Sequence, residues 1–596
     1  MFQTFEVTAR PEQGPPRLAA LREVLAVEGL DGFVVPRADA QQGEYVSARD
    51  ERLAWLTGFT GSAGFCVVLR DIAGVFIDGR YRTQVKAQVA DVYTPVPWPE
   101  TSMGEWLKTQ LPDGGRIGFD PWLHTPGQIE AAEKVLAGTG VSLVACDNLV
   151  DRCWPDQPAP AAAPAKVHPI EFAGESHDDK RARLAATLVE DGVDAAVITL
   201  PDSICWLLNI RGADIARNPV VQCFAILRGT GKVDLFIDPT KLEEVRGHLG
   251  PDVTCHPIEA FLDAVGSLEG PVRLDKSSVP CVVADAVGAR VSWGDDPCAL
   301  PKACKNAAEI DGSAEAHLRD GAAVVELLAW LDAQAPGTLT ETQVVGQLEQ
   351  ARRRDNALQD ISFETISGTG PNGAIMHYRV TEETDSTLED GHLLVLDSGG
   401  QYLDGTTDIT RTIAIGTPPE DACAAFTRVL SGMVGMSRLR WPKGLSGRDI
   451  EAIGRAPLWY AHQDFDHGLG HGVGAYLSVH EGPQRLSRVS TVPLEPGMIL
   501  SNEPGYYREG AFGIRIENLV VATVAEAPPG GDAHRVMLCG RTRTFAPIDR
   551  RLVVPALLDT ATRDWINAYH AETLEKIGPR VSDAARAWLV SACAPI

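Results

Sequence analysis

The sequence predicts a mixed α/β and α+β fold built from three domains. A chain of 596 residues corresponds to about three to four domains, and 44% hydrophobic with 22% charged residues is typical of globular proteins. Residues 155–165 contain four prolines, which exclude a regular helix and favour a semi-extended linker. A second break near residues 295–301 precedes a long helical pattern. The expected domains are therefore residues 1–160, 161–305 and 306–596.

The first two domains carry the same order of elements. Each has an amphipathic helix, then an apolar strand, a Trp-Leu pair and a strand that ends in aspartate. These are residues 18–28, residues 31–35, Trp55-Leu56 and Asp78 in the first domain, and residues 180–190, residues 194–198, Trp206-Leu207 and Asp238 in the second. The repeated motifs favour duplication of one α/β unit. Because the spacings differ, a common α/β alternation without duplication is the alternative.

The third domain mixes helices and strands, and a helical extension begins near residue 545. Hydrophobic periodicity predicts its main elements. They are a helix at 306–331, strands at 407–415 and 514–521, and closing helices at 559–574 and 582–592. We expect the closing helices to pack against the body of the domain or against a partner subunit.

The charge balance excludes several classes of partner. Lys and Arg number 54 and Asp and Glu 80, which gives a formal net charge of -26. An acidic surface repels phosphate backbones and anionic headgroups, so neither nucleic acid nor a membrane is expected as a partner. The sequence has no recognisable signal peptide and no apolar run of about 20 residues. The 12 cysteines form no C-x-x-C pair, which favours free thiols and a cytoplasmic location.

One match to a phosphate-binding motif occurs at residues 368–373, which read G-x-G-x-x-G. Pro371 and the following residues 374–378 do not open a helix. The match therefore predicts a glycine-rich loop, and no dinucleotide site is expected there.

Two aspartates mark a candidate acidic site. Asp397 ends an apolar strand, and Asp408 follows eleven positions later. A turn near residues 402–403 would place the two carboxylates opposite each other on one side of a sheet. A turn centred on residues 404–405 would instead pair Asp397 with Thr412. Two like charges this close repel each other unless a cation or a proton lies between them.

Histidines and a further acid follow in glycine-rich sequence. His467 and His471 alternate with glycines, which let an imidazole approach a site closely, and His480 follows an apolar residue. Glu517 is expected on the face of a strand opposite two isoleucines. Alone, each histidine could be an ordinary loop residue, and Glu517 could pair with Arg515 in solvent. Together, strand-borne acids beside glycine-flanked histidines indicate a site.

The charges of this set predict a pair of metal ions. The acids Asp397, Asp408, Glu503 and Glu517 carry -4, which two divalent cations and a bridging hydroxide would bring close to neutrality. With the imidazole of His471 they form a hard donor set that favours Mn²⁺, with Co²⁺, Fe²⁺ or Zn²⁺ as alternatives. Two such ions can deprotonate a shared water and polarise a carbonyl, as in aminopeptidases and phosphatases.

At these residues the sequence resembles the aminopeptidase P group (Xaa-Pro aminopeptidases) of the pita-bread metallopeptidases. The motifs are Leu-Asp-Ser-Gly-Gly, Thr-Asp-Ile-Thr-Arg-Thr, Gly-His-Gly-Val-Gly, Asn-Glu-Pro-Gly-Tyr-Tyr and Arg-Ile-Glu-Asn. They align the metal ligands of that family with Asp397, Asp408, His471, Glu503 and Glu517. The resemblance is specific from about residue 306 onward. Residues before it are similar to two copies of the creatinase-type N-terminal domain, as in the long cytosolic form of aminopeptidase P, which is usually a homodimer.

The resemblance implies two divalent metals and hydrolysis of the N-terminal Xaa-Pro bond of peptides, by a hydroxide that bridges the metals. Asp397 would chelate one metal, His471 and Glu503 would hold the other, and Asp408 and Glu517 would bridge them. Glu503 would also carry the proton from the nucleophile to the leaving nitrogen.

Three further histidines match substrate-contacting positions of the family. His377 and His480 correspond to histidines around the scissile bond, and His467 to a third pocket histidine. Each could instead be a structural histidine whose nitrogens bind backbone carbonyls.

Three other functions stay open. Prolidases (Xaa-Pro dipeptidases) share the ligand set but generally have one N-terminal domain, and methionine aminopeptidases usually have none. A non-catalytic pita-bread module that binds peptides or proteins belongs to a different class. The intact ligand positions and the lack of acidic or basic tails count against such a module.

Overall fold

The computed structural model describes residues 1–532 and 534–596. These residues form two compact units, which we call the N-unit and the C-unit. The N-unit comprises Thr8–Ile170 and Glu175–Leu300, and the C-unit comprises Met1–Val7, Glu171–Gly174 and Pro301–Ile596. The chain therefore begins in the C-unit, contributes four residues to it between the two sheets of the N-unit, and continues in it from Pro301 onward.

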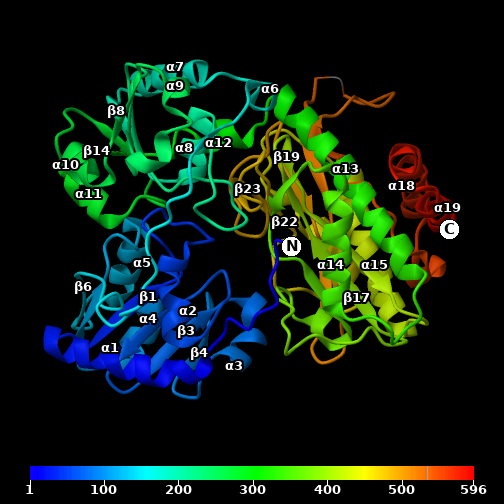
Figure 1. Ribbon diagram of the computed structural model, residues 1–596, viewed down its shortest axis with the longest axis horizontal. Helices are drawn as coiled ribbons and strands as arrows, with labels where there is room; N and C mark the ends of the chain where they lie inside the picture. Colours follow the sequence, from blue (N-terminus) through cyan, green and yellow to red (C-terminus); the bar gives the residue numbers. More distant parts are fainter. Residues whose placement is uncertain (533) are drawn as a thin grey trace. The chain divides into compact units, whose positions relative to one another are not determined.

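The N-unit contains two six-stranded sheets of identical topology (Figure 1). The first has the order β4-β3-β2-β1-β5-β6, with β1 (Gly32–Pro36), β2 (Phe65–Leu69), β3 (Ala73–Ile77), β4 (Thr94–Pro97), β5 (Gly115–Phe119) and β6 (Val141–Ala145). The second has the order β12-β11-β10-β8-β13-β14, with β8 (Ala195–Ile198), β10 (Phe224–Arg228), β11 (Val233–Phe236), β12 (Val253–His256), β13 (Val272–Leu274) and β14 (Val291–Trp293). Corresponding strand pairs also run in the same relative directions. This agreement is what duplication of one α/β unit predicts.

The helices of the N-unit repeat in the same way. The Trp-Leu pairs lie on corresponding short helices, α2 (Arg52–Thr57) and α8 (Pro201–Leu208), and the first helices of the two halves are α1 (Gly14–Glu28) and α7 (His177–Glu190). The others are α3 (Gln84–Gln88), α4 (Met103–Gln110), α5 (Pro126–Leu136), α9 (Arg246–Leu249), α10 (Phe261–Gly266) and α11 (Cys281–Val287). Helix α1 buries leucines at positions 18, 21 and 25, a spacing that places them on one face, and it ends at Gly29 in the left-handed conformation.

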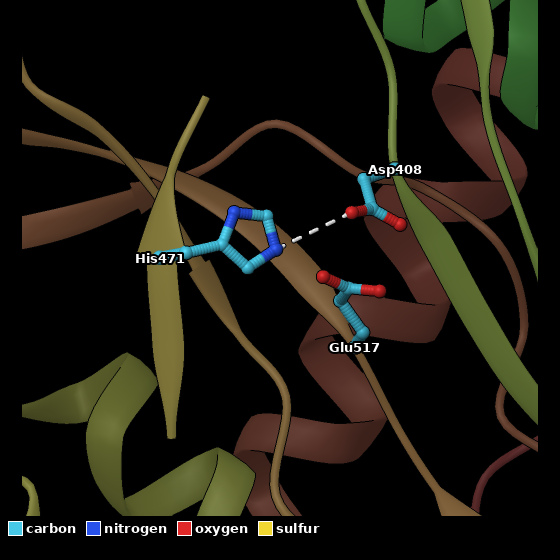
Figure 2. A group of neighbouring side chains, drawn as sticks. All are labelled: Asp408, His471 and Glu517. Atoms are coloured by element: carbon cyan, nitrogen blue, oxygen red, sulfur yellow. Dashed lines mark ion pairs between the residues drawn. The ribbon is translucent and has the colours of Figure 1, made fainter. Parts of the chain in front are cut away.

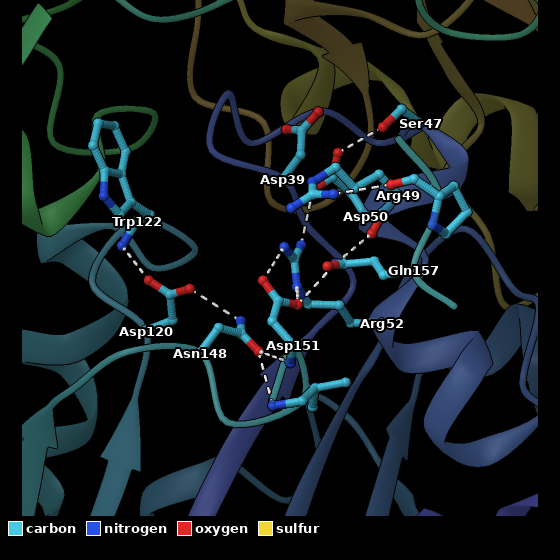
Figure 3. Close-up of polar contacts among 12 residues, drawn as sticks. Asp39, Ser47, Arg49, Asp50, Arg52, Asp120, Trp122, Asn148, Asp151 and Gln157 are labelled. Carbon is cyan, nitrogen blue, oxygen red and sulfur yellow. Dashed lines mark hydrogen bonds and ion pairs between the residues drawn. The ribbon is translucent and has the colours of Figure 1, made fainter. Parts of the chain in front are cut away.

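Hydrogen bonds attach the proline-rich linker to the N-unit (Figure 3). Residues 157–165 contain no helix or strand, as their prolines predict. Just before them, Arg52 donates two hydrogen bonds to the carboxylate of Asp151, at 2.6 and 2.9 Å. Arg49 donates to the carbonyl of Pro158 at 2.9 Å. The linker has no regular secondary structure, but its start is held in place.

The C-unit is organised around a six-stranded antiparallel sheet with the order β21-β28-β27-β24-β22-β23. Its strands are β21 (Arg440–Pro442), β22 (Gly470–Gly472), β23 (Glu481–Leu486), β24 (Ile499–Asn502), β27 (Asn518–Val524) and β28 (Met537–Thr542). Smaller sheets are formed by β15 (Leu358–Ile361), β18 (Gly400–Tyr402) and β19 (Gly405–Thr406); by β16 (Ile366–Thr369), β17 (Leu393–Ser398) and β20 (Ile409–Ala414); and by β25 (Gly505–Arg508) and β26 (Phe512–Arg515). The fold class is the predicted mixture of α/β domains and a C-terminal α+β body.

Helices surround these sheets. They are α13 (Ala307–Asp332), α14 (Glu341–Arg352), α15 (Glu420–Arg438), α16 (Gly447–Ile450), α17 (Ala452–Trp459), α18 (Thr560–Ile577) and α19 (Asp583–Ala592). Asn306 caps α13 in a reciprocal exchange with Glu309, whose side chain accepts from the Asn306 N–H at 3.0 Å. Helices α18 and α19 pack against α13, so the closing helices lie on the body of the C-unit (Figure 1).

One expected strand is wrong. The predicted strand at 514–521 is divided into β26 and β27, and these belong to different sheets. The chain crosses from one sheet to the other at Ile516 and Glu517, which belong to neither strand and whose N–H groups donate to the carbonyls of Pro504 and Thr410. Residues on both sides of the crossing are buried, so the apolar alternation of the sequence continues through residues 516 and 517. This pattern therefore does not reveal the break between the two strands.

None of the helices in the described ranges combines the length and the apolar character that a bilayer-spanning segment needs. All 12 cysteines are free thiols, as their scattered positions predict.

Candidate metal centre

Asp397 lies near the end of β17, a strand whose residues are all buried. Strands β16 and β20 pair with β17 on its two sides, so the backbone that carries this carboxylate is fixed. Its Oδ2 accepts two hydrogen bonds from Arg515, at 3.1 Å from Nε and 2.7 Å from Nη2. Its Oδ1 is buried and accepts no hydrogen bond from the described residues. One oxygen therefore binds a guanidinium, and the other faces a site that the protein leaves without a donor.

The hairpin after β17 brings Asp408 close to Asp397. Its turn lies at residues 403–404, and β17 pairs with β20 so that Asp397 lies opposite Thr410. Both expected registers, Asp397 opposite Asp408 or opposite Thr412, are wrong by two residues. A slip of two residues keeps each side chain on its original face, so the expectation that both carboxylates lie on the same side of the sheet survives.

Asp408, His471 and Glu517 converge on one point (Figure 2). One ligand atom from each lies within 4.8 Å of the others. His471 Nε2 is 3.5 Å from Asp408 Oδ2 and 3.7 Å from Glu503 Oε1. Its Nδ1 lies 2.8 Å from the carbonyl oxygen of Gly472. Because a carbonyl accepts, Nδ1 carries a proton, and Nε2 is directed at carboxylate oxygens.

The two glutamates reach the site from the ends of strands. Glu503 follows β24, and its N–H donates to the Leu469 carbonyl at 2.9 Å. Glu517 lies at the crossing between β26 and β27, where its Oε2 accepts from Thr410 Oγ1 at 2.8 Å. Its Oε1 is buried and, among the described residues, has no donor. The break in the predicted strand therefore places Glu517 in the site.

Burial and mutual repulsion make this cluster a proton-binding site when no cation is present. Burial, followed by the charge of Asp397, holds the pKa of Asp408 well above its usual range. Burial and the charge of Asp408 do the same to the pKa of Glu517. Burial and the charge of Glu517 raise the pKa of Glu503 to about 7. Positive charge placed among these groups would lower the pKa of each of them.

The donor set suits divalent cations. Asp397, Asp408 and Glu517 each present one buried oxygen that accepts no hydrogen bond from the part of the chain described. Such oxygens are costly unless a cation or a proton takes the place of the missing donor. Arg515 offsets one of the four carboxylate charges and leaves three uncompensated. Carboxylates with one imidazole are the ligands that hard divalent ions prefer.

His467 is connected to the same centre through hydrogen bonds. Its Nε2 lies 3.0 Å from the hydroxyl of Tyr507, and its Nδ1 lies 2.7 Å from the Gly468 carbonyl. The Tyr507 hydroxyl accepts from Arg515 Nη1 at 2.7 Å. Because Arg515 also binds Asp397, a continuous chain of contacts joins the predicted pocket histidine to a predicted metal ligand.

The other two histidines lie on different segments. The ring of His480 packs edge-on against that of His471, with 4.4 Å between centroids. Gly472 pairs with Glu481, which follows His480, so a backbone bridge sets the two rings side by side. His377 is half-buried in the turn after the short helix η8 (Gly370–Ala374).

The sequence did not identify Arg515 and Tyr507 as site residues. Arg515 was expected only as a possible solvent-exposed partner of Glu517. The structure buries Arg515, with 4% of its side chain exposed, and pairs it with Asp397 instead. A signal was present, because an arginine between two isoleucines in a strand is rarely buried without an anionic partner.

Comparison with known proteins agrees with this geometry. Residues 311–524, which include the five predicted ligands, match the profile of metallopeptidase family M24. A protein of Laccaria bicolor named "Probable Xaa-Pro aminopeptidase P" is 37% identical over 97% of this chain and 93% of its own length. A protein of the same name from Talaromyces marneffei is 38% identical over 94% and 89%. The chain belongs to metallopeptidase family M24, in its aminopeptidase P branch.

The rest of this M24 chain also matches known regions. Residues 17–153 and 156–309 each match a creatinase/prolidase N-terminal domain, and residues 537–596 match the C-terminal region of M24 peptidases. The crystal structure of an X-prolyl aminopeptidase from Caenorhabditis elegans, described as a cytosolic enzyme with a di-nuclear active site, superposes with a TM-score of 0.93. It is 32% identical and covers 98% of this chain and 99% of its own. A prolidase from Pyrococcus horikoshii, 22% identical with a TM-score of 0.50, shares the fold over 62% of this chain and 99% of its own.

Proposed function

We propose that this protein is a dinuclear-metal aminopeptidase that hydrolyses the N-terminal Xaa-Pro bond of peptides. One observation carries the proposal: Asp408, His471 and Glu517 bring ligand atoms within 4.8 Å of one another, and each of the two acids keeps one buried oxygen without a hydrogen-bond donor among the described residues. The names of the full-length relatives support the substrate class, and the di-nuclear site described for the Caenorhabditis elegans enzyme supports two metals.

The residues that would hold the metals are Asp397, Asp408, His471, Glu503 and Glu517. We assign Asp397 to one ion, His471 and Glu503 to the other, and Asp408 and Glu517 to both. The closeness of His471 to both Asp408 and Glu503, at 3.5 and 3.7 Å, supports this division. Two divalent ions there would lower the pKa of a bound water and polarise the scissile carbonyl.

The protein side chains would orient the reactants and move one proton. Glu503 would accept a proton from the attacking water and deliver it to the proline nitrogen as the bond breaks. Arg515 would hold Asp397 in place and, through Tyr507, keep His467 in the pocket. His467, His480 and His377 would contact the substrate.

His480 and His377 would lie around the scissile bond. The edge-on packing of His480 against His471 supports this role, because it keeps one imidazole directly beside a metal ligand. For His377 the support is the family motif that it shares.

We also propose the finer properties that the resemblance implies. The native metal would be Mn²⁺, because four carboxylates and one imidazole make a hard donor set. The enzyme would act in the cytoplasm as a homodimer. The chain would divide at residues 1–160, 161–305 and 306–596, a division supported by the two matching sheets and by the family matches.

The test is hydrolysis of a tripeptide with proline at its second position by purified protein loaded with Mn²⁺. Release of the first amino acid alone, with about two metal ions per chain, is the expected result. Cleavage confined to Xaa-Pro dipeptides would indicate a prolidase, and cleavage of Met-Ala ends a methionine aminopeptidase. A metal-loaded protein that cleaves none of these would favour a binding module.

A further inference from the structure

The turn that carries His377 is held by groups that are distant in sequence. It follows η8, which packs so closely on β26 that a Cβ on Gly513 would lie 1.6 Å from the carbonyl oxygen of Gly373. Strand β26 ends at Arg515, the partner of Asp397. The packing of η8 on β26 therefore fixes η8 and the turn after it relative to the strand that carries Arg515, the partner of Asp397.

Glu341 binds both ends of this segment from inside the C-unit. It is the first residue of α14 and is fully buried. Its Oε1 accepts from Asn372 Nδ2 at 3.0 Å, on η8, and its Oε2 accepts from the Tyr378 hydroxyl at 2.8 Å. It also accepts from the N–H groups of Thr369 and Ser386, at 2.7 and 3.2 Å. His377 thus lies between two residues that bind one carboxylate.

This carboxylate is held by neutral donors. All the hydrogen bonds that it accepts from described residues come from backbone N–H groups, an amide and a phenol. Burial raises the pKa of Glu341 to about 7, although each of these donors lowers it. A buried carboxylate without a cationic partner costs folding free energy. In return, the buried carboxylate of Glu341 fixes the positions of η8 and Tyr378.

The N-terminal segment Met1–Val7 covers the same region from outside. The side chain of Gln3, which is buried, exchanges two hydrogen bonds with the backbone of Thr365, at 2.8 and 3.2 Å. The carbonyl of Phe5 accepts from the Glu382 N–H at 2.8 Å. The Phe5 ring packs against the cluster that contains Tyr378.

We propose that Glu341, acting through Tyr378, and the segment Met1–Val7 form a clamp that positions His377 for the substrate. Glu341 binds Asn372 and Tyr378 on either side of the turn, and Phe5 packs against the cluster that contains Tyr378, so Glu341, Tyr378 and Phe5 are positioning residues. The inference rests on the proposed function, in which His377 contacts the substrate.

A double-mutant cycle tests the clamp. Tyr378→Phe removes one hydroxyl and should lower kcat/KM for an Xaa-Pro tripeptide about tenfold, the effect expected for losing a hydrogen bond to a charged group. Phe5→Ala should act in the same direction. In a His377→Ala background, Tyr378→Phe should change kcat/KM less than about twofold, because the group that it positions is gone. Equal losses in both backgrounds would show that Tyr378 acts on stability alone and would overturn the clamp.

Hydrogen exchange supplies a readout that needs no substrate. In Glu341→Gln and Tyr378→Phe, peptides covering residues 370–380 should exchange about tenfold faster, while β17 and β20 keep their protection. The matched control is Tyr93→Phe, a buried tyrosine of the N-unit whose hydroxyl donates to the Leu56 carbonyl at 2.6 Å. It should leave both readouts unchanged.

If the wild-type protein cleaves no Xaa-Pro peptide, the proposed function fails and hydrogen exchange alone decides whether the clamp exists. Unchanged exchange at 370–380 in both variants would refute the clamp.

Discussion

Replacing Glu503 with glutamine should make the metal-free protein more stable, although it removes a predicted metal ligand. Glu503 is one of four carboxylates packed around the site, and only 17% of its side chain is exposed. Burial and the charge of Glu517 raise its pKa from 4.5 to about 7. That change corresponds to roughly 3 kcal/mol against the ionised form in the folded chain. Glutamine keeps the shape without the charge, so we expect a gain of about 1–3 kcal/mol at pH 8.

The sign of this gain depends on pH. A carboxyl whose folded pKa is raised contributes stability below its unfolded pKa, and it loses that contribution as the pH rises through the folded value. For Glu503 the loss occurs between pH 4.5 and about 7. The advantage of Glu503→Gln should therefore be full at pH 8 and should disappear as the pH approaches 4.5.

The assay is the protection of amides in β17 and β20 against hydrogen exchange in the presence of a chelator, corrected for intrinsic rates. This reports the free energy of opening around the site. With excess Mn²⁺ the wild type should gain about 2.7 kcal/mol at a metal concentration one hundred times Kd, and the variant should gain far less. Glu495→Gln, at a surface pair with Lys443 (3.1 Å), should show no pH-dependent gain. A Glu503→Gln variant less stable than the wild type at pH 8 in chelator would refute the electrostatic reasoning.

Three further outcomes follow from the same site. Arg515→Met leaves Asp397 buried without its guanidinium and should cost about 3–5 kcal/mol in the same exchange assay, with Arg515→Lys recovering part of it; no loss would contradict the pairing. Gly513→Ala forces a methyl group onto the Gly373 carbonyl and should lower stability by about 2 kcal/mol or more in calorimetry, whereas a neutral result would show that η8 can move. Asp408→Asn should lower the metal content of gel-filtered protein from about two ions to one or fewer, as measured by mass spectrometry, and retention of both would remove Asp408 from the ligand set.

Local patterns were sufficient for much of the fold. The cap at Asn306 and the apolar spacing after it predict α13 to within one residue at each end. The repeated order of helix, strand and Trp-Leu pair predicts the duplication that the two sheets display. These signals are local because capping and amphipathic burial involve residues a few positions apart.

The register of the site hairpin shows where such signals end. The spacing of Asp397 and Asp408 leaves the turn undetermined, since shifting it by one residue moves the pairing by two without changing which face each side chain occupies. The choice of Thr410 as partner of Asp397 depends on contacts across the sheets. One such contact is the hydrogen bond from Thr410 to Glu517.

The sequence by itself determined the residue types of the site and the strands that carry them. An apolar strand that ends in an acid is a local pattern of a few neighbouring residues, so it can be recognised without the tertiary structure. Tertiary structure alone decided that Arg515 binds Asp397 and not Glu517, because the chain changes sheets between them. It also decided that Gln3 binds Thr365 and that Phe5 packs against the cluster that contains Tyr378, in each case more than 360 residues away. Contacts across such separations depend on the packing of whole elements, and no spacing or periodicity in the chain records them.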